Sequence, residues 1–209
     1  MTLAELRQQA VEVAGLDLET DEANALINEA YRELCFQSEW IRGYVPIGPG
    51  VDGQDAYDIP ARVIRILKLD VDGAPYDPSN IEEIQGLRRG DLSRRSNGFH
   101  WQSYTEDGTE QIGVYPTPSG GEEITIYAVL RPAADLSDDT DSPVTPPELG
   151  DRAILNYVQA NVLGDSEDDT ERRDYFLGEF GRLALEMKAL RFSRTSRKNA
   201  RVKIRGITA

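Results

Sequence analysis

The chain has 209 residues, of which 39% are hydrophobic and 29% are charged, and its formal net charge is −14. One cysteine and one histidine exclude an internal disulfide framework and the usual zinc sites. No apolar run approaches the roughly 18 residues of a membrane-spanning helix, and the charged N-terminus is unlike a signal peptide, so we expect a soluble protein made in a reducing compartment.

The charge is distributed unevenly along the chain. All 37 acidic residues lie in the first 186 positions, which have a net charge of −22, whereas the last 23 positions hold 8 basic residues and no acidic one. An acidic body with a basic end argues against nucleic-acid binding by the whole surface. It predicts that the basic end has a partner of its own.

Residues 1–42 are predicted to form a pair of antiparallel helices. Thr2 and Glu5 have the spacing of a capping box, and apolar residues follow at helical intervals. A second helix is expected after a cap at Thr20 or Asp21. Its apolar stripe repeats every three or four positions, at Ala23, Leu26, Ile27, Ala30, Tyr31, Leu34 and Ser38.

Residues 43–131 are predicted to form an inserted antiparallel β-domain. Runs rich in β-branched and aromatic residues are separated by turn signals such as Asp72-Gly73 and Asp107-Gly108. We expect four to six strands that form a meander. One face of the last strand is expected to be buried because apolar residues alternate along it, at Ile124, Ile126 and Ala128.

An acidic loop, a second helical pair and a basic arm complete the chain. Residues 132–147 hold four prolines and four aspartates without a hydrophobic period, which is typical of a long loop. Residues 148–190 are predicted to be helical, with Thr170 as a cap. Residues 191–209 are predicted to be an extended arm, because apolar residues alternate among the charges at Val202, Ile204 and Ile207.

These patterns together predict an α+β fold. The N- and C-terminal helical pairs form one antiparallel helix bundle, the antiparallel β-domain is inserted between them, and an extended basic C-terminal tail follows. The two helical pairs are expected to share one core, which contains Leu26, Ile27, Leu34, Ile154, Val158, Phe176, Phe180 and Leu183.

No motif for catalysis or cofactor binding is present, so we predict no catalytic residue, no cofactor and no metal. His100 would need an orienting acid and a nucleophile to act as a base, and it is interpreted as a structural histidine. Cys35 lies beside an apolar stripe and is interpreted as a core residue. The acidic clusters 135–141 and 165–169 lack the frame of a calcium-binding EF-hand loop and are interpreted as solvated linkers.

Five stretches, taken in order, resemble a known family. They are LINEAYRELC (Leu26–Cys35) followed by Trp40, AYDIPA (Ala56–Ala61), IGVYPTP (Ile112–Pro118), RPAADLSD (Arg131–Asp138), and Pro146-Pro147-Glu148 before a helix. They are similar to the LNxAYRELC, YDLP, LxLYPxP and RPxDLSxD stretches of the head–tail adaptor proteins of tailed bacteriophages, the connector or tail-tubular-A-like family. The resemblance covers residue 1 to about residue 190.

The resemblance implies a structural virion protein without a catalytic centre. Such adaptors form a ring, usually of twelve copies, that joins the portal to tail or nozzle proteins in the virion neck. The implied partners are the portal, the tail or nozzle protein and other copies of the chain, with assembly in the host cytoplasm and no membrane. DNA passes through the lumen during ejection without sequence-specific binding, and an acidic body suits this role because negative walls repel the duplex.

The basic tail has three possible roles: nucleic-acid binding, solubilisation as a disordered end, or docking against an acidic surface. The adaptor resemblance favours docking. We expect residues 191–209 to be disordered in the free protein, because they have too few apolar residues to offset the entropy lost on ordering. The residues predicted to bind the portal or a neighbouring subunit are Arg191, Arg194, Arg197, Lys198, Arg201, Val202, Lys203, Ile204, Arg205 and Ile207.

Two functions of other classes stay open. A virion-associated muralytic enzyme would show a pair of carboxylates in a cleft. A small nucleic-acid-binding regulator would bind DNA through the basic tail with a salt-dependent affinity, and deletion of the tail would abolish that binding.

Overall fold

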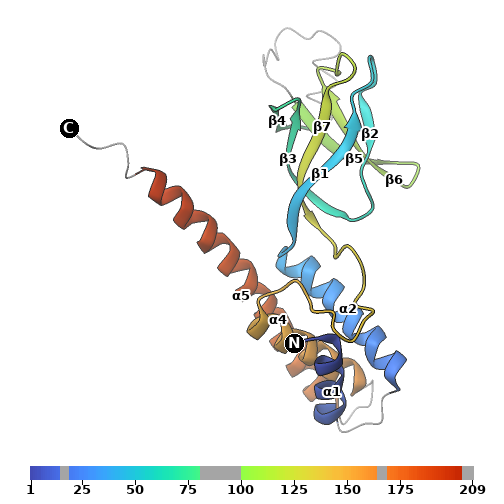
Figure 1. Ribbon diagram of the computed structural model, residues 1–209, viewed down its shortest axis with the longest axis vertical. Helices are drawn as coiled ribbons and strands as arrows, with labels where there is room; N and C mark the ends of the chain where they lie inside the picture. Colours follow the sequence, from blue (N-terminus) through green and yellow to red (C-terminus); the bar gives the residue numbers. More distant parts are fainter. Residues whose placement is uncertain (15–18, 81–99, 164–168, 204–209) are drawn as a thin grey trace, which may run out of the picture. The chain divides into compact units, whose positions relative to one another are not determined.

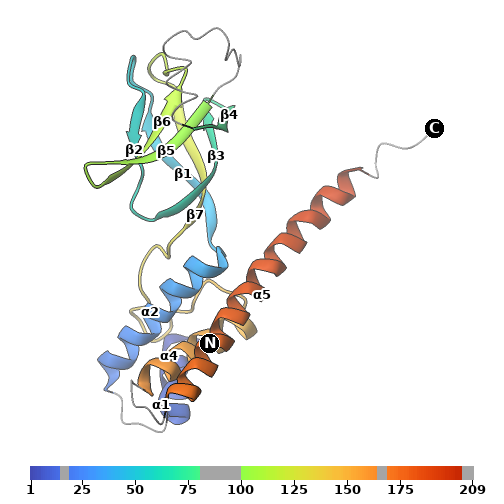
Figure 2. The same ribbon diagram turned by 180° about the vertical axis from the view of Figure 1, so that it is seen from behind.

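The computed structural model describes residues 1–14, 19–80, 100–163 and 169–203. The chain divides into two compact units, of which unit 1 combines Met1–Ile41 with Arg131–Ala209 and unit 2 is Arg42–Leu130. The described part of unit 1 is helical, and that of unit 2 is a curled seven-stranded mixed sheet (Figures 1 and 2). The α+β class expected from the sequence is confirmed.

The described part of unit 1 contains four helices: α1 (Leu3–Ala14), α2 (Thr20–Ser38), α4 (Pro147–Val162) and α5 (Thr170–Lys203). The predicted capping box of α1 is confirmed, since the Thr2 N–H donates to the Glu5 carboxylate at 2.9 Å and the Glu5 N–H donates to the Thr2 hydroxyl at 3.3 Å. The predicted cap of α2 at Thr20 or Asp21 is wrong. Glu19 occupies the cap position and forms no side-chain hydrogen bond there.

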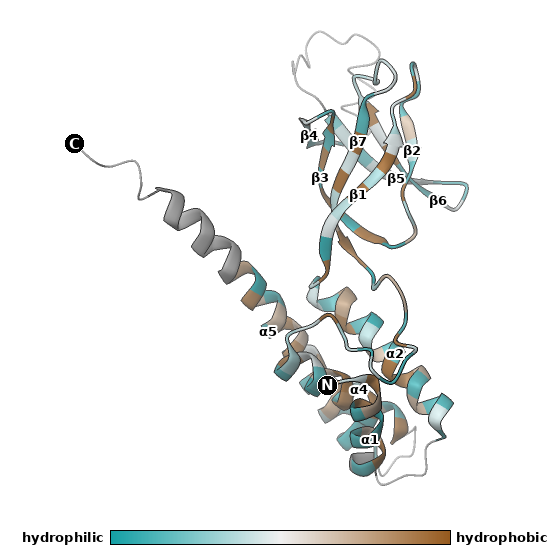
Figure 3. Cartoon of the chain, viewed as in Figure 1, coloured by the Kyte–Doolittle hydropathy of each residue, from teal (hydrophilic) through white to brown (hydrophobic). Residues whose placement is uncertain are grey.

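The helices of unit 1 share one hydrophobic core, to which each of them contributes buried side chains. Figure 3 shows hydrophobic residues in brown on these helices, interleaved with hydrophilic residues in teal. Leu26 packs against the edge of the core, and Phe176 is half-buried. The other expected core residues are buried within it: Ile27, Leu34, Ile154, Val158, Phe180 and Leu183.

The acidic loop over residues 132–147 is bound to the helices. The Asn28 amide group donates to the Leu136 carbonyl at 3.0 Å, and the Leu136 N–H donates back to the Asn28 side-chain oxygen at 2.7 Å. Arg32 donates to both carboxylate oxygens of Asp135 at 2.8 Å. The interpretation of cluster 135–141 as a solvated linker is therefore wrong for Leu136, which is buried in the core and holds the loop against it.

Helix α5 continues through the segment that was expected to be an extended arm. It spans 34 residues, about 51 Å at 1.5 Å per residue, and ends at Lys203. The prediction of an extended tail from residue 191 is wrong up to that point. The helix continues because there is no glycine or proline between Gly181 and Gly206, and because the Arg, Lys and Ala residues there favour helix. Residues 204–209 lie outside the described residues.

The sheet of unit 2 has the strand order β1-β7-β3-β4-β5-β6-β2. The predicted meander of four to six antiparallel strands is wrong, because β7 pairs with both β1 and β3, and β4 runs parallel to β5. Its strands are β1 (Arg42–Pro49), β2 (Ala56–Asp58), β3 (Val63–Val71), β4 (Ala74–Pro78), β5 (His100–Glu106), β6 (Thr109–Tyr115) and β7 (Glu123–Leu130).

Local patterns within the sheet were predicted correctly. Asp72-Gly73 and Asp107-Gly108 form tight turns, and all four residues have the positive φ angles that such two-residue hairpin turns require. The alternation in β7 is also confirmed, since the side chains of Ile124, Ile126 and Ala128 are fully buried.

We predict that Leu34→Ala will lower the free energy of unfolding by about 2–5 kcal/mol, because Leu34 is fully buried in the core of unit 1. Urea denaturation followed by circular dichroism measures the change. The matched control is Leu185→Ala on α5, where 67% of the side chain is exposed and the change should stay within about 0.5 kcal/mol. Equal effects of the two substitutions would contradict the assignment of Leu34 to the core.

Candidate functional site

The described residues offer little for chemistry. They contain no group of three or more His, Cys, Asp or Glu side chains arranged to hold a metal ion. In the described part of the chain no helix combines the length and apolar character needed to cross a membrane. His100 is 7% exposed at the start of β5, in keeping with its interpretation as a structural residue. The second acidic cluster, 165–169, lies outside the described residues except for Asp169.

The Cys35 thiol is unsuited to nucleophilic chemistry. The side chain is fully buried in the core of unit 1, and burial raises the pKa of the thiol to about 12. Since the thiolate is the reactive form, the group stays protonated and inert near neutral pH. Cys35 acts as a small apolar residue of α2.

The carboxylate of Asp141 binds its own loop. It accepts the backbone N–H of Ser137 at 2.8 Å and that of Asp138 at 2.9 Å. These hydrogen bonds, that of Asp138 first, lower the pKa of Asp141 because they stabilise the charged form. Hydrogen bonds within the loop therefore account for the lowered pKa of Asp141, and no metal ion is needed to explain it.

The basic part of α5 begins beside the end of α2. The Lys188 ammonium lies 2.8 Å from the Glu39 carboxylate, and the Arg191 guanidinium lies 5.6 Å from the centre of the Trp40 ring. Both contacts are within unit 1. They hold the first turn of the basic segment against the residues that follow α2, so the position of Arg191 is fixed within unit 1.

The predicted partner-binding residues fall into two groups. Arg191, Arg194, Arg197, Lys198, Arg201, Val202 and Lys203 belong to α5, whereas Ile204, Arg205 and Ile207 lie outside the described residues. Positions 191, 194, 198 and 201 are three or four residues apart, a spacing that puts them on one side of a helix. The expectation of an extended arm missed this helical register, although the absence of helix-breaking residues was a signal for it.

Exposed apolar side chains precede and enter this basic segment. Leu185 is 67% exposed and Phe192 is 52% exposed, and they are seven residues apart on α5. Ala189 lies between them on the same side of the helix and is exposed as well. This second apolar stripe has a weak sequence signal, because it lies on the same helix as the longer apolar stripe that faces the core.

A groove of about 400 Å³ lies on the surface of α2 and α4. The Tyr157 hydroxyl donates to the Glu29 carboxylate at 2.9 Å inside it, and burial, with Glu29 and Glu33 nearby, raises the pKa of Tyr157 to about 12. Phe36 lines the groove with 54% of its side chain exposed. The groove also contains two cations, of which Arg32 is paired with Asp135 at 2.8 Å. The groove thus brings two carboxylates, two guanidinium groups and an exposed aromatic ring together.

A comparison with known protein families matches nearly the whole chain, including both units. Residues 1–205 match the family model described as SU10 adaptor protein. A search of curated proteins found no match.

We predict that the Cys35 thiol will not react with a thiol reagent such as 5,5′-dithiobis(2-nitrobenzoate) in the native protein at pH 8, because its pKa is raised far above that pH. Absorbance at the thionitrobenzoate band measures the reaction. The control is the same protein in guanidinium chloride, which should release one equivalent. Rapid reaction of the folded protein would show a reactive thiolate and contradict a purely structural role.

Proposed function

Because the chain belongs to the SU10 adaptor protein family, a family of phage head–tail adaptors, we propose that it forms a ring that joins the portal to the tail or nozzle proteins. Family membership makes it a structural protein of the bacteriophage virion. The twelve-fold ring, the two partners and the central DNA channel are the proposed details. The observation that supports them most is the separation of charge between an acidic body and a basic helical end.

We assign docking to the basic part of α5 and the residues after it. This segment binds the portal or a neighbouring subunit through Arg191, Arg194, Arg197, Lys198, Arg201, Val202, Lys203, Ile204, Arg205 and Ile207. A neighbouring copy offers an oppositely charged surface, because the first 186 residues have a net charge of −22. Opposite charges on the basic segment and the acidic body favour contact between them over contact between two acidic bodies.

Charge alone does not explain stable docking. An exposed ion pair is worth about 0–1 kcal/mol, and salt screens it further. The apolar side chains of Leu185 and Phe192 supply the missing term, because their exposed surface is removed from water when a partner covers α5. Docking therefore combines a steering charge with an apolar contact on the same helix.

The acidic body has a physical use in a DNA channel. The first 186 residues have a net charge of −22, so many copies around a lumen create a strongly negative wall. Such a wall repels the phosphate backbone and lets the duplex slide during packaging and ejection. In the alternative of a nucleic-acid-binding regulator, the basic helix would bind DNA directly. In the muralytic alternative, the purified protein would hydrolyse cell walls, which we do not expect.

We predict that the purified chain will be monomeric or weakly associated at low ionic strength and will form rings when portal is added. Like net charges of −14 repel each other, and the repulsion is strongest where salt screens least. Mass photometry with and without portal measures the assembly. Stable rings of the chain alone at low salt would contradict this expectation.

We predict that the triple variant with Arg194, Arg197 and Arg201 replaced by Glu will lose portal-dependent assembly, because charge reversal turns attraction into repulsion on one helix. Sedimentation with portal measures the loss. The matched control reverses three exposed cations of the body, Arg62, Lys68 and Arg152, with the same change in net charge.

The control variant should still assemble. Loss in both variants would indicate a nonspecific charge effect, and assembly of both would exclude α5 as the docking element. Wild-type binding to duplex DNA that is lost only in the triple variant would favour the regulator alternative instead.

A further inference from the structure

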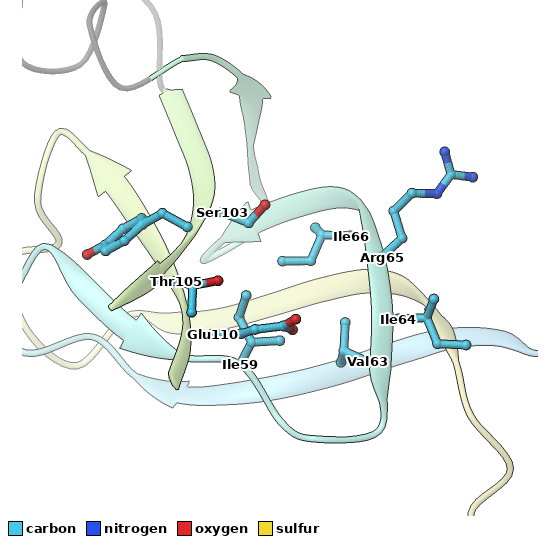
Figure 4. Close-up of a pocket in the computed structure, with 9 residues that line it drawn as sticks. Ile59, Val63, Ile64, Arg65, Ile66, Ser103, Thr105 and Glu110 are labelled. Carbon is cyan, nitrogen blue, oxygen red and sulfur yellow. The ribbon is translucent and has the colours of Figure 1, made fainter. Parts of the chain in front are cut away.

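Unit 2 contains a groove at a place where one strand of its sheet ends early. The groove has a volume of about 240 Å³ and is lined by β3 on one side and by β5 and β6 on the other (Figure 4). In the sheet, β4 is the strand between β3 and β5. Among the described residues, β4 pairs with β3 only at positions 69–71 and with β5 only at His100 and Trp101.

The registers of these pairs show where a longer β4 would run. Continued beyond Pro78, such a strand would lie opposite positions 63–66 of β3 and positions 102–105 of β5. Most of these positions line the groove. We therefore regard the groove as a slot of one strand's width, and we call it the β4 slot.

The wall formed by β5 presents backbone groups to the slot. The two-residue turn at Asp107-Gly108 makes Glu106 and Thr109 a hydrogen-bonded pair, so every second residue from Glu106 back along β5 bonds to β6. The N–H and C=O groups of Ser103 and Thr105 then point away from β6. The hydrogen bond from the Ser79 N–H to the Trp101 carbonyl, 2.8 Å long, confirms this direction for a residue of the same set.

The floor of the slot is apolar and has an acidic group beside it. Figure 4 shows Ile59, Val63 and Ile66 between the two walls, together with the carboxylate of Glu110. Ile64 and Arg65 also line the groove, at the place where the register shift between Val63 and Arg65 marks a bulge in β3. The Arg65 side chain is directed away from the Glu110 carboxylate in Figure 4.

We propose that the β4 slot binds an extended segment of another virion protein by β-strand addition to β5. The segment has apolar side chains at alternate positions, which contact Ile59, Val63 and Ile66, and a Lys or Arg that pairs with Glu110. The basic end of this chain is a poor occupant, because it is helical as far as Lys203. The inference rests on the proposed function only in taking the partner from the same virion.

A strand edge with accessible N–H and C=O groups specifies its ligand by geometry. Main-chain hydrogen bonds from Ser103 and Thr105 provide the affinity, and the alternation of the pleat provides the selectivity for apolar residues on one face. An exposed edge of this kind also invites unwanted pairing, which proteins usually prevent by covering it. A bound segment would serve as that cover in the assembled virion.

The test uses the full-length protein and short overlapping synthetic peptides that span the portal and tail proteins of the same virion. We expect at least one peptide to bind and to slow hydrogen exchange at the amides of Ser103 and Thr105 at least tenfold. The amide of Tyr104, which belongs to the set bonded to β6, is the internal reference and should change little. If no peptide protects the Ser103 and Thr105 amides, the inference is wrong.

Two variants and one control test the floor and the charge. Ile66→Asp should weaken peptide binding about tenfold or more, because it puts a carboxylate on the apolar floor. Glu110→Arg, an exposed position, should weaken a cationic peptide similarly without affecting the fold. The matched control is Glu106→Arg on β5, an exposed position outside the lining of the groove, which should bind as the wild type does. Equal binding by all three variants would overturn the inference.

Failure of the peptide test can be distinguished from failure of the proposed adaptor function. If no peptide binds while the wild-type chain still assembles on portal, the β4 slot has no such role and the adaptor function stands. If the wild-type chain binds neither portal nor tail protein, the proposed function fails independently of the slot. Circular dichroism of Ile66→Asp verifies folding, and Glu110→Arg provides the decisive result if that variant is unfolded.

Discussion

The fold depends on one constraint, which is that the two ends of the chain must share a single hydrophobic core. Neither α1 with α2 nor α4 with α5 buries its apolar stripe alone, and together they enclose Leu34, Ile154 and Leu183. Burial of these stripes is the dominant favourable term. The segment between the pairs must therefore leave the helical unit and return to it, which makes the sheet an insertion.

The return of the chain is fixed by polar contacts at a defined place. Asn28 of α2 satisfies both backbone groups of Leu136, and the buried Leu136 side chain fills the same core. Because both hydrogen bonds of this buried amide would be lost in another arrangement, they select one conformation of the loop at Leu136. Two aspartates of this loop stabilise its conformation. Asp135 pairs with Arg32, and the Asp141 carboxylate accepts the backbone N–H of Ser137.

Both proposed binding surfaces lie where two neighbouring elements differ in length. Helix α5 has 34 residues against 16 in α4, so among the described helices its basic end continues beyond the length of its antiparallel partner. In the sheet, β4 has five residues against nine in β3, and the slot lies where it ends. In each unit the unequal lengths leave a surface that a partner can cover, one by charge and one by backbone pairing.

Local features could be predicted from the order of residues alone: the Thr2 capping box, the apolar stripe of α2, the Asp-Gly turns, the alternation in β7 and the family. Each depends on residues within a few positions of one another. Three features became known only from the folded chain: the place of β7 between β1 and β3, the parallel pair of β4 and β5, and the binding of the acidic loop to Asn28. These features pair residues far apart in the chain, and local periodicity contains no information on such partners. The extension of α5 to Lys203 was only partly predictable from the sequence. Helix propensity favoured it, while three alternating apolar residues suggested a strand.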